Sequence, residues 1–280
     1  MTPNLILTTI DRNGNKTMQA AIDISWLQLG LFSLTMLIPI SLSSYFRLGI
    51  GRDIWVSLGR MALQLMLVGF YLEYVFTINS LLLNLIWVAI MIAVGGSAII
   101  GKANLPKRPL MFPVTAGLIC GLVPMLLLIC FFVIQPQPWF SAQYLIPISG
   151  MLLGNSLSGN IVALQNLYGA FEQRKDEYEA ALSLGASPQY ASIPFVRAAM
   201  QKAMAPILAT MATTGLVTLP GMMTGQILGG ASPMLAIKYQ LVIFIAIFVM
   251  MNISLTICLQ LSVKKTITKE GKVLVNFLKN

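Results

Sequence analysis

Long apolar runs follow one another through the chain, and they constrain its fold more than any other feature. A helix of about 20 residues crosses the hydrocarbon core of a bilayer. The runs predict about seven spans, at residues 24–46, 55–76, 81–100, 112–134, 144–169, 205–229 and 235–263. Only 10% of the residues are charged, whereas soluble domains have about 25%. The sequence therefore predicts an all-α, polytopic membrane protein.

The basic residues predict the orientation of these spans. If the spans alternate across the bilayer, all 18 basic residues except Arg12, Lys16 and Lys238 fall on one side. An excess of Lys and Arg marks the cytoplasmic side. We therefore expect the N-terminus outside, the C-terminus in the cytoplasm, and lipid around the spans. The net charge of +9 does not indicate nucleic-acid binding, because the basic residues form no stripe or face.

The same pattern predicts the domain organisation. Residues 1–23 are a polar, poorly ordered tail, and residues 264–280 are a basic cytosolic tail. Residues 24–263 form a single transmembrane permease domain, which includes a charged cytosolic hairpin at residues 170–204.

The hairpin has the sequence signals of two capped helices. Residues 172–184 are hydrophilic and end at Gly185, a residue that readily forms a left-handed cap. Ser187 can cap the next helix, with Pro188 at its first position. Pro194 is expected to end that short helix or to start the following segment. Such capping favours a platform for a partner protein over an unstructured linker.

The fifth predicted span is unusually polar. At helical spacing Asn155, Ser158 and Gln165 with Asn166 form one stripe. Ser149, Ser156 and Asn160 lie beside it. Buried amides need partners, so this surface faces either a neighbouring helix or a water-filled path, and both interpretations stay open. Gln64 in the second span is a further candidate for the path.

The sixth predicted span carries a helix-breaking sequence, Leu219-Pro220-Gly221. Broken helices expose backbone groups, and transporters place substrate sites there. Met222 and Met223 follow with thioether groups that could contact a soft metal. The alternative is a kinked helix that packs tightly against a neighbour.

The sequence contains no residues for catalysis or for a nucleotide site. Gly96-Ser-Ala-Ile-Ile-Gly101-Lys102-Ala103 resembles a P-loop, but it ends in Ala where a hydroxyl should hold magnesium. It also ends an apolar span. The chain has no histidine, the commonest general base and metal ligand. We therefore expect no enzyme, no cofactor and no metal site in this chain.

Two resemblances concern the hairpin and the spans. Glu179-Ala180-Ala181 with Gly185 resembles the cytoplasmic loop of ABC permeases, although Pro194 comes earlier than that loop's usual closing proline. A wider resemblance, over about residues 53–261, is to the FetB-type iron-export ABC permeases, relatives of the plant aluminium-tolerance membrane subunits. Its most specific parts are Leu219-Pro220-Gly221-Met222-Met223 and Ile237-Lys238-Tyr239-Gln240. Further matching residues are Gly59-Arg60, Gln64-Leu65, Gly69, Ile146-Pro147-Ile148, Gly150-Met151, Gly154-Asn155, Leu182-Ser183-Leu184-Gly185-Ala186, Pro188, Gly215-Leu216-Val217 and Gly225.

The resemblance implies a permease in the inner membrane that exports iron or a related metal. It implies a separate ABC ATP-binding subunit that carries ATP and Mg, with two copies of each subunit. The residues that would contact that subunit are Glu179, Ala180, Ala181, Leu184, Gly185, Ala186 and Pro188. Ala209 and Ala212 stand where some relatives have a polar residue and a lysine, which leaves the exported species open.

Two other functions remain as alternatives. A secondary transporter or channel would need titratable groups in mid-membrane, and Glu73 is the only acidic candidate. A membrane scaffold without transport would pack the polar fifth span without water and would bind no ATPase.

Overall fold

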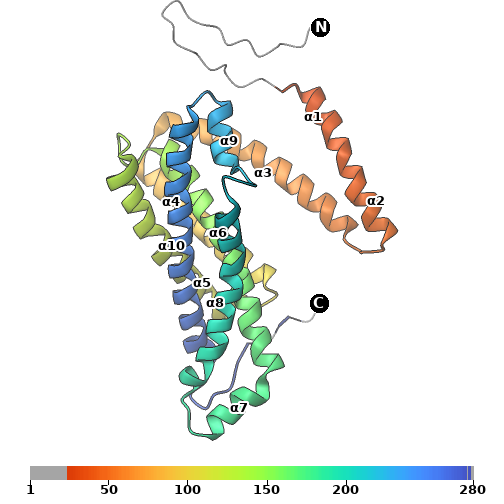
Figure 1. Cartoon of the computed structure of the whole chain (residues 1–280), viewed down its shortest axis with the longest axis vertical. Coiled ribbons are helices and arrows are strands. Elements are labelled where there is room, and N and C mark those ends of the chain that lie inside the picture. The colour runs from red at the N-terminus through yellow and green to blue at the C-terminus, as the bar shows by residue number, and fades with distance from the viewer. Residues whose placement is uncertain (1–23, 276, 279–280) are drawn as a thin grey trace, which may run out of the picture. The chain divides into compact units, whose positions relative to one another are not determined.

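A computed structural model describes residues 24–275, 277 and 278 of the chain (Figure 1). The predicted tail at residues 1–23, with Arg12 and Lys16, lies outside the described residues. Within the described residues the regular structure is helical, with isolated bridges only at Thr214–Thr218 and Ile267–Val273. The all-α prediction is confirmed. The chain divides into two compact units.

The first unit contains the chain up to Ile78 together with Thr224–Pro233. Its helices are α1 (Trp26–Ser33), a 3-10 turn η1 (Leu34–Met36), α2 (Leu37–Tyr45), α3 (Gly51–Ile78) and most of α9 (Gly221–Leu228).

The 3-10 turn in the first unit has a local cause in Pro39. The proline ring clashes with the carbonyl of the residue four positions earlier. That residue is Thr35, which lies in η1, so the helix tightens one turn before the proline. Most apolar side chains of α1–α3 are not buried within this unit.

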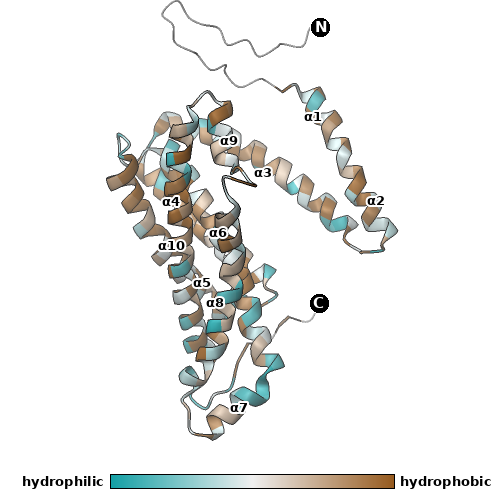
Figure 2. Ribbon diagram, viewed as in Figure 1, coloured by the Kyte–Doolittle hydropathy of each residue, from teal (hydrophilic) through white to brown (hydrophobic). Residues whose placement is uncertain are grey.

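The second unit is a helical bundle that contains the remaining residues. Its helices are α4 (Leu81–Lys102), α5 (Lys107–Leu128), a π-helical turn η2 (Ile129–Ile134), α6 (Ala142–Gln173), α7 (Lys175–Ser183), α8 (Pro188–Thr213) and α10 (Pro233–Thr266). The long helices lie side by side, and α7 lies at one end of them (Figure 1). Figure 2 shows that hydrophilic residues gather on α7 and the adjoining end of α6.

Two glycines let α5 approach α10 closely. A Cβ atom on Gly117 would lie 2.7 Å from the carbonyl oxygen of Ser254, and one on Gly121 would lie 2.8 Å from that of Met250. Both distances are too short for any side chain. Small residues at such crossings allow helices to pack without a hydrophobic driving force in lipid. The glycines therefore fix the separation of α5 and α10.

Six helical stretches among the described residues are long and apolar enough to cross a membrane. They are Trp26–Tyr45, Gly51–Ile78, Leu81–Lys102, Lys107–Ile134, Ala142–Gln173 and Pro233–Thr266. Each corresponds to one of the predicted spans. The predicted sixth span, residues 205–229, is not among them, because it consists of the end of α8, non-helical residues and the short α9. Seven spans and the orientation of the termini stay predictions.

The expectation that a helix ends or begins at Pro194 is wrong. α8 continues through both Pro194 and Pro206 to Thr213. The helix is held by a stripe that recurs every four residues and is buried: Ala191, Phe195, Ala199, Ala203 and Ile207. This packing outweighs the backbone hydrogen bonds that the prolines remove.

Candidate coupling site and transport path

The first candidate site is the hairpin apex, residues 184–187, between α7 and α8. Gly185 has φ +88°, in the left-handed region that glycine adopts without strain. Its amide donates to the Leu182 carbonyl at 2.9 Å, and the Ala186 amide donates to the Ala181 carbonyl at 3.1 Å. The amide of Tyr190 donates to the Ser187 hydroxyl at 3.3 Å, which caps α8. The predicted caps at Gly185, Ser187 and Pro188 are therefore confirmed.

Below the apex, an aromatic cluster attaches α7 to the bundle. Tyr178 is only 4% exposed. Phe171 on α6 stacks on Phe195 of α8 with 4.9 Å between ring centroids, and the Tyr178 ring lies 5.2 Å from Phe171 and 6.1 Å from Phe195. Burial raises the pKa of Tyr178 above its usual value. The cluster joins α6, α7 and α8.

Charged residues at the start of α7 form pairs with one another. Arg174 forms an ion pair with Glu177, and its guanidinium lies 5.1 Å from the centroid of the Phe195 ring. The hydrogen bond from Arg174 lowers the pKa of Glu177 below its usual value. Lys175 Nζ lies 3.4 Å from Glu179 Oε1. Both pairs are on the surface, so they orient side chains more than they stabilise the fold.

The residues predicted to contact an ATPase lie together at and beside the apex. Leu184 is 89% exposed, and Glu179, Ala180 and Gly185 are also exposed. Ala181, Ala186 and Pro188 are half-buried. Leu184 is the most exposed large apolar side chain of the hairpin. The apex therefore presents a small apolar tip above a fixed base.

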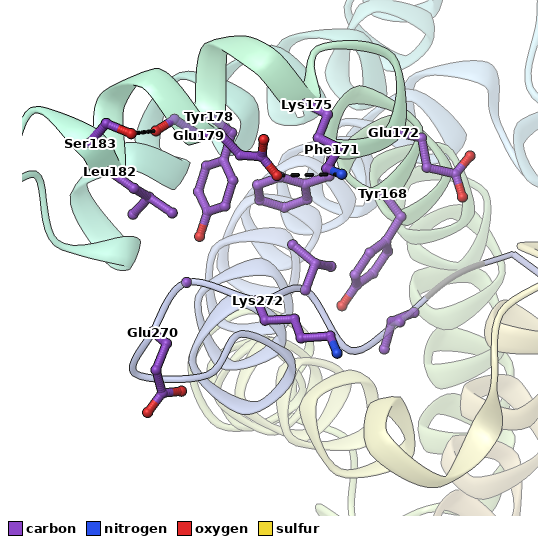
Figure 3. A pocket seen from close by; sticks show the side chains of 13 residues that line it. Tyr168, Phe171, Glu172, Lys175, Tyr178, Glu179, Leu182, Ser183, Glu270 and Lys272 are labelled. Atoms are coloured by element: carbon purple, nitrogen blue, oxygen red, sulfur yellow. Dashed lines mark hydrogen bonds and ion pairs between the residues drawn. The ribbon is translucent and has the colours of Figure 1, made fainter.

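A C-terminal strap, residues 267–275, packs against the hairpin. Ile267 bridges to Val273, and Gly271 turns the chain with φ +86°. A Cβ atom on Gly271 would lie 2.4 Å from Cδ1 of Leu182 on α7. Val275 is buried. A cavity of about 700 Å³ separates the rest of the strap from α6 and α7, and Lys175, Glu179 and Lys272 line it (Figure 3). The strap therefore contacts α7 at Leu182, close to the apex.

The polar stripes of α6 lie on different surfaces. Ser149, Ser156 and Asn160 are fully buried. Asn160 Nδ2 donates to Ser254 Oγ of α10 at 3.0 Å and to the Ser156 carbonyl at 2.8 Å. Asn160, a predicted path residue, therefore joins two helices in the described structure. The interpretation as a helix–helix contact holds for this stripe.

The other stripe is exposed, and part of it lines a cavity. Asn155 and Ser158 of α6 face Pro206 and Thr210 of α8 across a space of about 230 Å³, with Met251 of α10 at its wall. The Asn155 amide nitrogen donates to the Met151 carbonyl at 2.8 Å. The cavity is lined by apolar residues and glycines together with hydroxyl, amide and thioether groups, and no charged residue lines it. It is the candidate transport path.

The remaining predicted path residues lie outside this cavity. Gln165 donates to the carbonyl of Lys102 at 3.1 Å, near the end of α4. Gln64 is an exposed residue of α3 in the first unit. Asn155 and Ser158 are thus brought together by the structure, whereas Asn160 and Gln165 bond to neighbouring helices.

The break after α8 lies earlier than the proline predicts. Helix α8 ends at Thr213, and residues 214–220 are not helical. Gly215 has φ +92°, its amide donates to the Thr218 carbonyl at 2.9 Å, and Leu216 is 93% exposed. We call residues 214–220 the α8–α9 break. Pro220 lies at its end, as expected of a residue before a helix start.

Threonines explain why the helix stops before the proline. Thr210, Thr213 and Thr214 donate their hydroxyls to the carbonyls of Pro206, Ala209 and Thr210, at 3.0, 3.0 and 2.7 Å. Such bonds back to the preceding turn compete with the helix ladder and bend it.

The two methionines after the break lie in α9. Gly221 is the first residue of that helix, and Met222 and Met223 are half-buried. Met222 packs against the apolar core of the bundle. For Met222 the structure shows a packing contact, and its contact with a metal stays a prediction. Among the described residues no group of three His, Cys, Asp or Glu side chains is placed to hold a metal ion.

Comparison with known sequences decides the family. The sequence model of a family described as an uncharacterised protein family, UPF0014, matches residues 26–267, which is most of the chain. The chain belongs to the UPF0014 family. No solved structure matches it.

Three relatives illustrate the range of this family. The UPF0014 membrane protein YjkA of Bacillus subtilis is 34% identical over 238 residues, 85% of this chain and 92% of the relative. The protein of Escherichia coli named "Probable iron export permease protein FetB" is 30% identical over 257 residues, 90% of this chain and 95% of the relative. The Arabidopsis protein ALUMINUM SENSITIVE 3 is 31% identical over 209 residues, 74% of this chain and 75% of the relative. The resemblance drawn from the sequence is confirmed.

Two features of this UPF0014 protein were missed by sequence reasoning. The aromatic cluster could have been found, because Phe171, Tyr178 and Phe195 are large apolar residues within a charged hairpin. The strap could not, because residues 264–280 read only as a basic tail. The P-loop-like residues 96–102 lie inside α4 and are helical, unlike a phosphate-binding loop.

Proposed function

We propose that this UPF0014 membrane protein is the permease subunit of an ABC transporter that exports iron or a related metal from the cytoplasm across the inner membrane. ATP and Mg would bind to a separate ATPase subunit, and the working complex would contain two copies of each chain. The observation that carries the proposal is the exposed apolar apex on a fixed base.

The hairpin has the properties that docking requires. Leu184 is nearly fully exposed, so a partner can bury it without displacing any other part of the chain. Apolar side chains of this kind contribute strongly to binding when they enter a pocket on the partner. The aromatic cluster and the strap hold the base of α7. A displacement of the apex would therefore be transmitted to α6 and α8 through the aromatic cluster.

Helix α8 connects the apex to the candidate path. Its 26 residues correspond to about 39 Å of helix. The helix begins at the apex, passes the cavity at Pro206 and Thr210, and ends at the α8–α9 break. Closure of two ATPases would tilt this helix, and the cavity wall formed by α8 would move relative to Asn155 and Ser158 of α6.

The lining of the cavity suits a cargo that must be released. A path binds its cargo weakly enough for it to leave, and neutral oxygen and thioether groups bind metals more weakly than charged ligands do. Asn155, Ser158, Thr210 and Met251 supply such groups. The name of the Escherichia coli relative supports iron as the exported metal.

The test is co-purification of the chain in nanodiscs with an ABC ATPase encoded beside it, followed by ATP hydrolysis with and without ferrous iron. Gly185→Leu should reduce ATPase binding about tenfold, because a side chain in the left-handed region costs about 1–2 kcal/mol and displaces the apex. Leu184→Glu should reduce binding without backbone strain, because Leu184 contacts little else in the chain.

Gly49→Leu is a matched control. Gly49 also has a left-handed backbone, with φ +70°, and no atom would lie within 4 Å of its Cβ. It lies in the turn between α2 and α3, outside the hairpin. Equal loss of binding in both glycine variants would remove the hairpin from docking. Absence of any ATPase binding by the wild type, with metal transport retained, would show a secondary transporter.

A further inference from the structure

A second large groove lies between α8 and α10, on a different face of α8 from the candidate path. Its volume is about 830 Å³, within the range of pockets that bind small molecules. The apolar wall is formed by Val196, Met200 and Met204 of α8 and Val263 of α10. None of these residues lines the cavity that contains Asn155 and Ser158. The groove is therefore separate from the candidate path, and it reaches the apex at Ser187.

One end of the groove is positively charged. Arg197 of α8 and Lys264 of α10 both line it and are exposed. Neither helix contains an acidic residue along its length. The acidic residues of α6, α7 and the strap do not line the groove; they are Glu172, Asp176, Glu177, Glu179 and Glu270. The charges of the groove are thus complementary to an anion.

The groove lies at a membrane boundary. Helix α10 is a candidate span, and its two consecutive lysines, Lys264 and Lys265, stand in its last turn. Lysines at the end of a span extend towards the headgroups. Tyr190, also at the groove, is 70% exposed, and amphipathic aromatic residues are enriched at the same level of the bilayer.

We propose that this groove binds an anionic phospholipid of the bilayer. The headgroup phosphate would lie between Arg197 and Lys264, with hydrogen bonds from Gln201 and Gln260 at the rim. One acyl chain would extend along Met200 and Met204. Basic pockets between membrane helices bind anionic lipid headgroups in this way. The proposal does not depend on which metal is transported, or on whether ATP drives transport.

The experiment measures which lipids stay with the full-length protein. The chain is placed in nanodiscs of phosphatidylcholine with a minor fraction of phosphatidylglycerol, re-extracted in mild detergent, and analysed by native mass spectrometry. The wild type should retain phosphatidylglycerol in preference to phosphatidylcholine. The double variant Arg197→Gln/Lys264→Gln should reduce that preference roughly 25-fold, since each interfacial charge contributes about a fivefold factor.

The matched control removes two charges from the same two helices outside the groove. Lys202→Gln/Lys265→Gln fits this purpose, because neither residue lines the groove and Lys265 Nζ lies 5.2 Å from the centroid of the Phe112 ring on α5. This control should keep the preference for phosphatidylglycerol. An equal loss in both double variants would show attraction to the whole basic surface and would overturn the proposed site.

A second variant tests the apolar wall without changing charge. Met204→Trp fills the groove and should reduce retention of both lipids while the protein stays folded in the nanodisc. If neither groove variant changes lipid retention, but Met204→Trp dissociates a dimer of the chain, a second copy covers the groove and the lipid proposal is wrong.

Discussion

The two ends of α8 differ in how the helix is capped and in how closely other residues pack around it. At its start, Ser187 caps the helix, Gly185 turns the chain, and Phe195 holds the first turns against α6 and α7. At its other end, threonines bond back to the last turn, and Leu216 is almost fully exposed. The start of the helix is held by packing, and its end leads into an exposed, non-helical stretch.

The largest effect should come from the fixed end. Phe195→Ala should lower the free energy of unfolding by about 3–5 kcal/mol, because it leaves a cavity between the Phe171 and Tyr178 rings and the Arg174 guanidinium. Thermal unfolding in nanodiscs measures the change. Phe132→Ala is the control, since Phe132 is 75% exposed in η2 and should shift stability little. Similar shifts in the two variants would mean that the cluster does not fix α7.

A pair of glycine substitutions compares the ends directly. Gly185→Ala and Gly215→Ala meet the same left-handed backbone, with φ +88° and +92°, and neither Cβ would have an atom within 4 Å. Each should cost about 1–2 kcal/mol of strain. Gly185→Ala should weaken ATPase binding, whereas Gly215→Ala should leave binding intact and lower metal export. If both variants lost the same property, the two ends of α8 would not have distinct roles.

The strap should have a smaller effect on the fixed end. Gly271→Ala places a Cβ against the flexible tip of Leu182 and strains a turn with φ +86°. We expect about 1–2 kcal/mol of local destabilisation and faster hydrogen exchange in α7, measured by mass spectrometry. Unchanged exchange in α7 would show that the strap does not support the hairpin.

A change at the open end should alter transport alone. Pro220→Ala restores an amide donor at the end of the α8–α9 break and relaxes the fixed backbone angle. The rate of metal export in proteoliposomes should change, and ATPase binding should not. An unaltered export rate would remove this segment from the path.

The smallest effect concerns the ion pair at the start of α7. The hydrogen bond from Arg174 lowers the pKa of Glu177 below the ordinary value of 4.5. The pair therefore stabilises the hairpin at and above that pH, and the contribution disappears as the pH falls through the lowered pKa. Glu177→Gln should remove this part of the acid sensitivity of hairpin hydrogen exchange. Identical pH profiles for the variant and the wild type would show that the pair contributes nothing measurable.

The amino-acid sequence by itself determined that the chain lies in a membrane, that its spans are helical, and that the hairpin turns at residues 184–187. Apolar runs of membrane length can only be helical in lipid, and the signals at Gly185, Ser187 and Pro188 depend on local backbone preferences alone. These features can be predicted without knowing which distant segments pack together. The family also followed from short motifs that the full comparison confirms.

Contacts between distant segments were decided only by the tertiary structure. The sequence could not show which polar stripe of α6 is buried against a helix and which lines a cavity. The answer depends on Ser254 of α10 and on Thr210 of α8. It placed a helix boundary at Pro194, where a buried stripe from Ala191 to Ile207 keeps α8 continuous. It did not reveal the strap, whose position depends on Gly271 meeting Leu182. In each case packing between helices outweighs the local preference, because apolar burial and buried hydrogen bonds exceed the propensity of single residues.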